Sequence, residues 1–323
     1  MKAIVVGAQG PMLAEVAEPV PGPQEVLVRV RACGLNRADL GMAAGHRHGS
    51  AGGAGAVLGL EAAGEVLALG AEVDGMRVGD RVMCSGAGAF AERMVADAGR
   101  VTPIPGEALG FEQAAGLPVA LQTMHDAVIT HGQLRPGGTV LVQGASSGVG
   151  LMAMQIARWR GASVVIGTST DAGRRARLGE YGAHLALDSS DVGWVGQVLE
   201  ATGSLGVDVV IDQVSGALAT PTMRATRILG RIVNVGRLGG MRADFDFDLH
   251  ALRRITYVGV TFRTRSVAEV REINARMRAD LEGELAAGRL GLPVDRVFDF
   301  DQAAAALEHM RANRHFGKLI LRL

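Results

Sequence analysis

The stretch Gln143-Gly144-Ala145-Ser146-Ser147-Gly148-Val149-Gly150 decides the fold. It follows the apolar run 139–143, which predicts a strand, and opens the run 148–160, which predicts a helix closed by Gly161. The first glycine permits a tight turn, and the later two let backbone approach a pyrophosphate and let the helix pack on the strand. Free amides and the helix dipole favour phosphate at such a turn. We therefore expect a dinucleotide site at residues 144–150.

This glycine-rich stretch departs from the usual spacing. One extra residue separates the glycines compared with G-x-G-x-x-G, and two serine hydroxyls lie in the loop. A glycine-rich turn that binds no ligand is the alternative interpretation. The position between a strand and a helix favours the dinucleotide site.

The end of the next predicted strand, 163–167, indicates which dinucleotide is bound. Enzymes that use NAD place an acidic residue there to bind the ribose hydroxyls, but residues 167–170 (GTST) contain none. Asp171 fits the N-cap of the following helix. Arg174 and Arg175 come next, and arginine binds phosphate by paired hydrogen bonds, although both could instead form a solvated helix face. We expect NADPH, with these residues at its adenosine end: Thr168, Ser169 and, on the 2′-phosphate, Arg174.

Composition narrows the class of protein. The 323 residues suggest two domains. An apolar content of 48% and a mean hydropathy of +0.21 indicate a globular chain. Lys plus Arg and Asp plus Glu are 33 each, and this zero balance argues against nucleic-acid binding. Two cysteines cannot form a disulfide framework or a structural zinc site. Neither a signal peptide nor a membrane-spanning run is apparent, so we expect a cytoplasmic protein with no membrane partner.

The rest of the chain shows two kinds of pattern. Up to about residue 122, short strand-like runs such as 25–31 and 64–70 follow one another closely, which is typical of a β-barrel or sandwich. From residue 123, apolar strand-like runs alternate with helical ones, which predicts a doubly wound α/β domain with a parallel sheet covered on both faces. The strands expected there are 139–143, 163–167, 185–187, 208–212, 231–235 and 255–260, and the helices are 148–160, 171–181, 192–201 and 217–229.

With these motifs in view, the chain resembles the medium-chain dehydrogenase/reductase superfamily, and within it the zinc-free NADPH:quinone oxidoreductases. The resemblance implies a Rossmann domain at 123–265 and a GroES-like β-barrel domain formed by 1–122 and 266–323. The superfamily motifs are 26–39, 58–66 (LGLEAAGEV), 79–82 (GDRV), 117–123, the glycine stretch and 317–319, and the closer match lies in 33–40 and 261–269.

The resemblance also implies that no zinc is bound. Zinc alcohol dehydrogenases of this superfamily have a Cys where Asn36 stands, a His where Leu60 stands, and a further Cys near Val119. Amide and aliphatic side chains are not zinc ligands. The four-cysteine structural lobe is also missing. We therefore expect no metal, and a hydride acceptor that delocalises its own negative charge, such as a quinone or an α,β-unsaturated carbonyl compound.

The resemblance places the Asn36 amide and the Thr123 hydroxyl near the nicotinamide, where hydrogen-bond donors could stabilise an oxyanion. Asp39 is expected to orient Asn36 or its loop. The alternatives are a satisfied turn residue for Asn36, a helix cap for Thr123 and a structural hydrogen bond for Asp39. Three further positions are expected to contact the cofactor: Val214, Gly236 and Phe262.

Some positions depart from the family. Many members have a Tyr where Asp188 ends the predicted strand 185–187. Tyrosines common in the 40s are replaced by a Gly- and His-rich stretch, 41–56, which we expect to be a mobile loop. His46 or His48 there could donate a proton, with a solvated loop as the alternative.

The expected function is NADPH-dependent hydride transfer to a small-molecule quinone. An enone or enoyl-thioester reductase needs equivalent chemistry, and a non-catalytic NADPH-binding protein, like the lens crystallins of this branch, is the alternative from another class. Relatives in the branch form dimers through the last strand of the Rossmann sheet, so we expect a homodimer built on Tyr257–Phe262. A monomer whose own loop, such as 239–247, covers that strand is the alternative.

Overall fold

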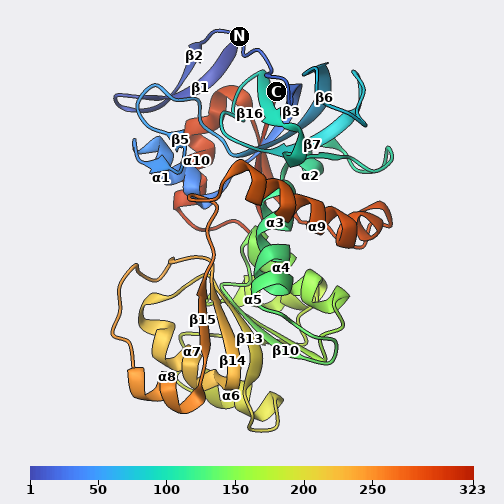
Figure 1. Cartoon of the computed structure of the whole chain (residues 1–323). Coiled ribbons are helices and arrows are strands. Elements are labelled where there is room, and N and C mark those ends of the chain that lie inside the picture. The colour runs from blue at the N-terminus through green and yellow to red at the C-terminus, as the bar shows by residue number, and fades with distance from the viewer. The chain divides into compact units, whose positions relative to one another are not determined.

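The computed structural model describes all 323 residues and divides into two compact units (Figure 1). The first unit consists of Met1–Gln122 and Phe262–Leu323, and the second of Thr123–Thr261. Residues 262–265 thus belong to the first unit, whereas the sequence placed them in the Rossmann domain. One contact explains the difference, because the backbone of Arg263 lies so close to Gly49 that a Cβ there would be 2.7 Å from the Arg263 carbonyl oxygen.

The second unit is built on a six-stranded parallel sheet with the order β12-β11-β10-β13-β14-β15. The first strand along the chain, β10, lies inside the sheet, and the order reverses between β10 and β13. This parallel order confirms the expected doubly wound sheet. Ligands bind beyond the carboxyl ends of the strands at such a reversal. The strands are β10 (Thr139–Gln143), β11 (Val164–Thr168), β12 (Leu185–Leu187), β13 (Val207–Asp212), β14 (Thr226–Asn234) and β15 (Thr256–Gly259).

Helices connect these strands. The expected helix 148–160 is confirmed as α4, whereas 171–181 forms two short helical segments, α5 and η3. The prediction of a helix over 217–229 is wrong at its end. Thr226 leaves the helix and pairs with Val207 before a register shift in the sheet. The elements are α3 (Pro118–His125), the π-helix η2 (Asp126–His131), α4 (Gly148–Trp159), α5 (Ala172–Ala176), η3 (Leu178–Tyr181), α6 (Trp194–Ala201), η4 (Gly216–Leu218), α7 (Ala219–Ala225) and α8 (Phe247–Arg253).

The first unit is a partly open barrel with the strand order β16-β17-β3-β6-β7-β9, and β8 pairs with β3 beside this path. Its core gathers alternating apolar residues from both chain segments, such as Val28 on β3 and Leu321 on β17. This agrees with the expected GroES-like barrel. The strands are β1 (Lys2–Gly7), β2 (Gly10–Glu15), β3 (Glu25–Gly34), β4 (Arg47–His48), β5 (Ala51–Gly52), β6 (Glu61–Leu69), β7 (Arg81–Ser85), β8 (Arg93–Asp97), β9 (Val101–Pro103), β16 (Val294–Asp299) and β17 (Lys318–Arg322).

The two segments of the first unit are joined by strand pairing. β17 runs antiparallel to β3, with Ile320 opposite Gly34 and Arg322 opposite Ala32. The C-terminal segment therefore completes the barrel. The helical elements are α1 (Arg37–Ala43), η1 (Ala98–Arg100), α2 (Phe111–Ala115), α9 (Val267–Ala286), η5 (Phe300–Gln302) and α10 (Ala303–Arg311).

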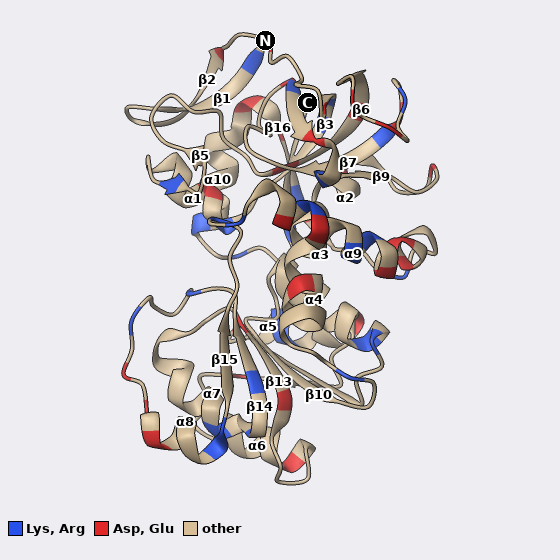
Figure 2. Ribbon diagram, in the orientation of Figure 1, with Lys and Arg blue, Asp and Glu red and all other residues tan.

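Charged residues of both signs are interspersed over the elements of each unit (Figure 2). The charges of α9, for example, pair with one another at four-residue spacing, as in Arg276 with Glu272. None of the helices has the length and apolar character that crossing a membrane requires.

Candidate active site

The glycine loop links β10 to α4 in the second unit. Gly144 adopts a left-handed φ of +68°, which a residue with a side chain rarely tolerates. Ser147 caps α4, because its Oγ accepts the Gly150 N–H at 3.1 Å. A Cβ on Gly150 would lie 2.7 Å from the Cα of Ala145. These residues are glycine because the helix begins in direct contact with the turn before it.

The first turn of α4 offers free hydrogen-bond donors. The backbone hydrogen bonds of the helix begin at Leu151, whose N–H donates to the carbonyl of Ser147. Gly150 uses the Ser147 hydroxyl, so the amides of Gly148 and Val149 have no acceptor within the chain. Such amides at the positive end of a helix bind anions. The loop therefore fits the pyrophosphate of a dinucleotide.

The end of β11 is connected directly to this loop. Thr168 accepts the Gly144 N–H on its hydroxyl at 3.1 Å and the Ala145 N–H on its carbonyl at 2.8 Å. The Ser169 hydroxyl lies 3.2 Å from that of Ser146. The structure thus brings together the predicted cofactor residues of the loop with Thr168 and Ser169.

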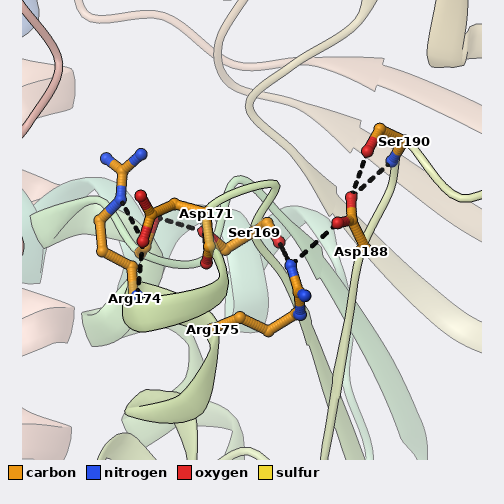
Figure 3. Close-up of polar contacts among 7 residues, drawn as sticks. Ser169, Asp171, Arg174, Arg175, Asp188 and Ser190 are labelled. Atoms are coloured by element: carbon orange, nitrogen blue, oxygen red, sulfur yellow. Dashed lines mark hydrogen bonds and ion pairs between the residues drawn. The ribbon is translucent and has the colours of Figure 1, made fainter.

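Four charged residues surround the end of β11 (Figure 3). The prediction that Asp171 caps the next helix is confirmed, because its Oδ1 accepts the Arg174 N–H at 2.8 Å. Arg174 Nε lies 3.6 Å from the same oxygen. Arg175 Nη1 donates to the Ser169 carbonyl at 2.8 Å and to Asp188 Oδ2 at 3.0 Å. Hydrogen bonds to Asp171 and Asp188 lower the pKa of both carboxyl groups, chiefly from the backbone of Arg174 to Asp171 and from the Ser190 hydroxyl to Asp188.

The loops after β13 and β14 complete this part of the second unit. The side chain of Val214 lies against Gly144, and a Cβ on Gly236 would be 2.6 Å from the Gln213 carbonyl oxygen. Gln213 in turn accepts a hydrogen bond from the Ser147 hydroxyl at 2.9 Å. Val214 and Gly236, both predicted, therefore lie in loops packed against the glycine loop.

A buried carboxylate that the sequence analysis missed shapes these loops. Asp212 Oδ1 accepts the N–H groups of Val214 and Ser215 at 2.9 and 2.8 Å. Asn234 donates to the Ser215 hydroxyl at 2.5 Å. Burial raises the pKa of Asp212. Polar residues at the carboxyl ends of two neighbouring strands, Asp212 and Asn234, were the available signal.

In the first unit, Asn36 belongs to a buried ionic cluster. Lys318 Nζ donates to Glu61 Oε1 at 2.5 Å, to the Leu35 carbonyl at 2.8 Å and to Asn36 Oδ1 at 3.1 Å. Asn36 Nδ2 donates to Glu61 Oε1 at 2.9 Å. Lys318 is 5% exposed and Glu61 is inaccessible. Lysine and glutamate are almost never buried unless paired, so this pair orients the Asn36 amide from both ends.

This cluster does not fit a zinc ion. The ammonium group of Lys318 already supplies a positive charge among the oxygens of Leu35, Asn36 and Glu61. The second oxygen of Glu61 accepts the Val119 N–H at 2.8 Å. No group of three His, Cys, Asp or Glu side chains is arranged to hold a metal.

Asp39 lies beside this cluster and is fully buried. Its Oδ2 accepts the Asn36 N–H at 2.6 Å, and its Oδ1 has no hydrogen-bond partner. Burial raises the pKa of Asp39 to about 7, although the Asn36 amide and Lys318 oppose the shift. Asp39 therefore holds the backbone at the start of α1, where Asn36 is the N-cap.

The remaining predicted residues make no hydrogen bond to this cluster. Thr123 is a buried residue inside α3, so it does not cap that helix, and it belongs to the second unit. Phe262 begins the second segment of the first unit. The stretch 41–56 contains the short β4–β5 hairpin rather than a plain loop. His48 lies on β4, where burial lowers its pKa.

Two family models match the chain. Residues 22–106 match the alcohol dehydrogenase GroES-like domain, and residues 148–278 match the zinc-binding dehydrogenase family. The first match covers much of the barrel, and the second begins at the first residue of α4.

Curated relatives match over nearly the full chain. The synaptic vesicle membrane protein VAT-1 homolog of Homo sapiens is 30% identical over 322 residues, which cover 94% of this chain and 80% of that protein. A component of the phenolphthiocerol/phthiocerol polyketide synthase of Mycobacterium tuberculosis is 32% identical over 307 residues, which cover 95% of this chain. The chain spans only 14% of the length of that synthase component.

Solved structures share the fold. A quinone oxidoreductase of Pseudomonas syringae pv. tomato DC3000 superposes with a TM-score of 0.86 and 28% sequence identity, over 100% of this chain and 99% of that one.

Proposed function

Because the chain belongs to the medium-chain dehydrogenase/reductase superfamily, we propose that it is an NADPH-dependent, zinc-independent oxidoreductase that transfers hydride to a quinone. The glycine loop with its free amides supports dinucleotide binding. The similarity to a quinone oxidoreductase supports the class of acceptor.

The observation that carries the choice of NADPH is the surroundings of Ser169. The segment 167–170, at the end of β11, contains no acidic residue, whereas an enzyme specific for NAD needs one there. The nearest one, Asp171, is engaged at the start of α5 through its Oδ1. Arg174, at the same turn, is the proposed ligand of the 2′-phosphate, since a guanidinium group binds phosphate oxygens in pairs.

The acceptor half of the site is proposed around Asn36. When NADPH is bound, its nicotinamide supplies the hydride. Asn36 Nδ2 uses one hydrogen on Glu61 and points the other toward the Gly34 carbonyl at a long 3.5 Å. Because that contact is long, an acceptor oxygen would compete well for the second hydrogen. A donor held in place before the reaction stabilises developing negative charge most effectively. Thr123 is the second proposed donor.

An activated alkene is the second candidate acceptor. The similarity to part of a polyketide synthase favours it, and the same donors would stabilise an enolate as well as a quinol anion. A protein that binds NADPH without turnover is the candidate from another class.

Steady-state oxidation of NADPH tests these functions. A panel of quinones and a panel of enones and enoyl thioesters should be compared at equal concentration. Turnover that is fastest with quinones supports the proposal, and turnover confined to the alkenes favours the second candidate. Tight binding of NADPH without any turnover would leave only the non-catalytic function.

Replacement of Arg174 tests the choice of cofactor. Arg174→Ala should raise the KM for NADPH about 10- to 100-fold, because a charge-assisted hydrogen bond contributes about 1.5–3 kcal/mol, and should leave the KM for NADH nearly unchanged. Arg177→Ala is the matched control, since Arg177 lies one turn further and pairs with Glu180. Equal losses with both cofactors would refute the assignment of Arg174.

A further inference from the structure

The proposed function assigns no role to the ion pair between Arg175 and Asp188. Arg174 and Arg175 are neighbours on α5, yet they engage different carboxylates (Figure 3). Arg174 lies beside Asp171, and Arg175 is held by Asp188 and by the carbonyl of Ser169. One nitrogen, Nη1, makes both contacts of Arg175, so its guanidinium group lies at the end of β11, where the adenosine ribose is expected.

Asp188 is held firmly in place. It follows β12, and the Ser169 N–H donates to the carbonyl of the preceding Leu187 at 3.0 Å, so the two strand ends are adjacent. Asp188 Oδ1 accepts the Ser190 hydroxyl at 2.5 Å and the Ser190 N–H at 2.9 Å. Its other oxygen is used by Arg175. The same hydrogen bonds lower the pKa of Asp188, so it carries its charge at neutral pH.

The four charges therefore cancel at the place where a 2′-phosphate would arrive. A phosphate near Ser169 is attracted by Arg174 and Arg175 and repelled by Asp171 and Asp188. Arg175 is anchored to Asp188 and to Ser169 through Nη1. Turning its guanidinium group fully toward a phosphate would cost the hydrogen bond to Asp188, and a charge-assisted bond of this kind is among the stronger ones in proteins.

We propose that Asp188 is a specificity-determining residue, because it withholds Arg175 from the 2′-phosphate and so limits the preference for NADPH over NADH. The inference rests on the proposed use of NADPH. In the wild type, the preference for NADPH over NADH comes from Arg174 alone. Arg175 would be a second ligand of the 2′-phosphate if Asp188 did not bind it.

Direct binding measurements test this proposal without turnover. Isothermal titration calorimetry with NADPH, NADH, 2′,5′-ADP and 5′-AMP should be performed on the wild type and on Asp188→Asn. The amide keeps an acceptor for Ser190 but removes the charge that holds Arg175. We expect the Kd for NADPH and for 2′,5′-ADP to fall about tenfold, the scale of one charge-assisted hydrogen bond, and the Kd for NADH and 5′-AMP to stay the same.

Two further variants identify the cause. Asp191→Asn removes the same charge three residues away, where the side chain contacts the Gly193 N–H and not Arg175. It should leave all four Kd values unchanged. In the double variant Asp188→Asn with Arg175→Gln, the gain in affinity should disappear. An unchanged affinity in Asp188→Asn, or a gain that survives in the double variant or appears equally in Asp191→Asn, would overturn the proposal.

The same titrations separate this inference from the proposed function. Wild-type protein that binds NADPH more tightly than NADH, with no response to Asp188→Asn, contradicts only the role of Asp188. Wild-type protein that binds 2′,5′-ADP no better than 5′-AMP contradicts the use of NADPH, and the role of Asp188 falls with it. A thermal unfolding curve for each variant checks that it is folded.

Discussion

A carboxyl group that is buried with one oxygen unpaired makes the stability of the first unit depend on pH. Asp39 has a pKa of about 7 in the folded chain, against about 3.9 for an exposed aspartate. Between these values the folded state holds a proton that the unfolded state has released. The free energy of unfolding therefore falls as the pH rises through this window, and it levels off above about pH 7.

Asp39→Asn should remove this dependence. The asparagine keeps an oxygen for the Asn36 N–H but has no charge to desolvate. Relative to the wild type, the variant should gain about 3 kcal/mol of stability between pH 4.5 and 8, since each pKa unit corresponds to about 1.4 kcal/mol. Urea unfolding at the two pH values measures the gain. Asp301→Asn, an exposed residue of the same unit, is the control, and parallel curves for Asp39→Asn and the wild type would contradict the prediction.

Substitution of Lys318 should lower the stability of the protein, because its charge and that of Glu61 compensate each other. Lys318→Met leaves an unpaired buried carboxylate and should cost about 3–5 kcal/mol. Adding Glu61→Gln should recover part of that loss. Arg276→Met, which breaks an exposed pair with Glu272, should cost less than about 1 kcal/mol. Urea unfolding of the four proteins is the measurement, and a double variant no more stable than Lys318→Met would argue against a mutual pairing.

Residues of the site differ in how far the sequence could predict them. The role of Asp171 could be predicted because a cap joins residues that are only three positions apart. The contact of Lys318 with Glu61 joins positions 257 residues apart, and local patterns carry no information on such a distance. A single charged residue among apolar ones, as in 58–63 and 317–321, was the local sign of it.

At the scale of elements, α4 depends on its close approach to the glycine loop. Gly150→Ala would place a methyl group 2.7 Å from the Ala145 Cα and from the Gly144 carbonyl oxygen. It should destabilise the protein by about 1–3 kcal/mol, the usual range for overpacking. Gly196→Ala on α6 meets no atom within 4 Å and should instead stabilise by up to about 1 kcal/mol through helix propensity. Thermal unfolding of both variants measures these changes in stability. If both substitutions changed the stability in the same direction, the result would contradict this packing.

Elements that are set by local pattern were predicted closely. β10 and β12 have the expected bounds, because both are short apolar runs between turn residues. The boundary between α7 and β14 was missed because residues 217–229 show helical spacing throughout. Pairing of Thr226 with Val207 overrides that pattern, since propensity is a weak guide where tertiary contacts compete. The split between α5 and η3 likewise follows from tertiary context.

At the scale of the whole molecule, β15 is an edge strand (Figure 1). It pairs with β14 on one side only. Phe245, from the loop 239–247, touches Tyr257 through its ring, with centroids 6.0 Å apart, but no backbone group covers the free side of the strand. Since an uncovered edge invites pairing with another chain, we propose a homodimer in which two copies of β15 pair across a twofold axis.

Gly259→Pro tests this dimer. The Val260 N–H donates to Asn234 on β14, so the N–H of Gly259 faces the free edge, because neighbouring residues of a strand point to opposite sides. Proline removes that donor, whereas Gly259→Ala keeps it, and a Cβ there meets nothing within 4 Å. Light scattering should show dimers for the wild type and Gly259→Ala and monomers for Gly259→Pro, with circular dichroism confirming that each is folded. A wild type that is monomeric at micromolar concentration would refute the dimer.

The division of the first unit into two chain segments has a consequence for synthesis on the ribosome. Residues 123–261 leave the exit tunnel as one stretch that contains every strand of its sheet. β3 can pair with β17, and Glu61 with Lys318, only after more than 250 further residues have been translated, which takes about 15–50 s at typical rates. During that time the nascent barrel presents an unpaired strand edge and an uncompensated carboxylate. The second unit can therefore finish folding first, although its sequence comes later.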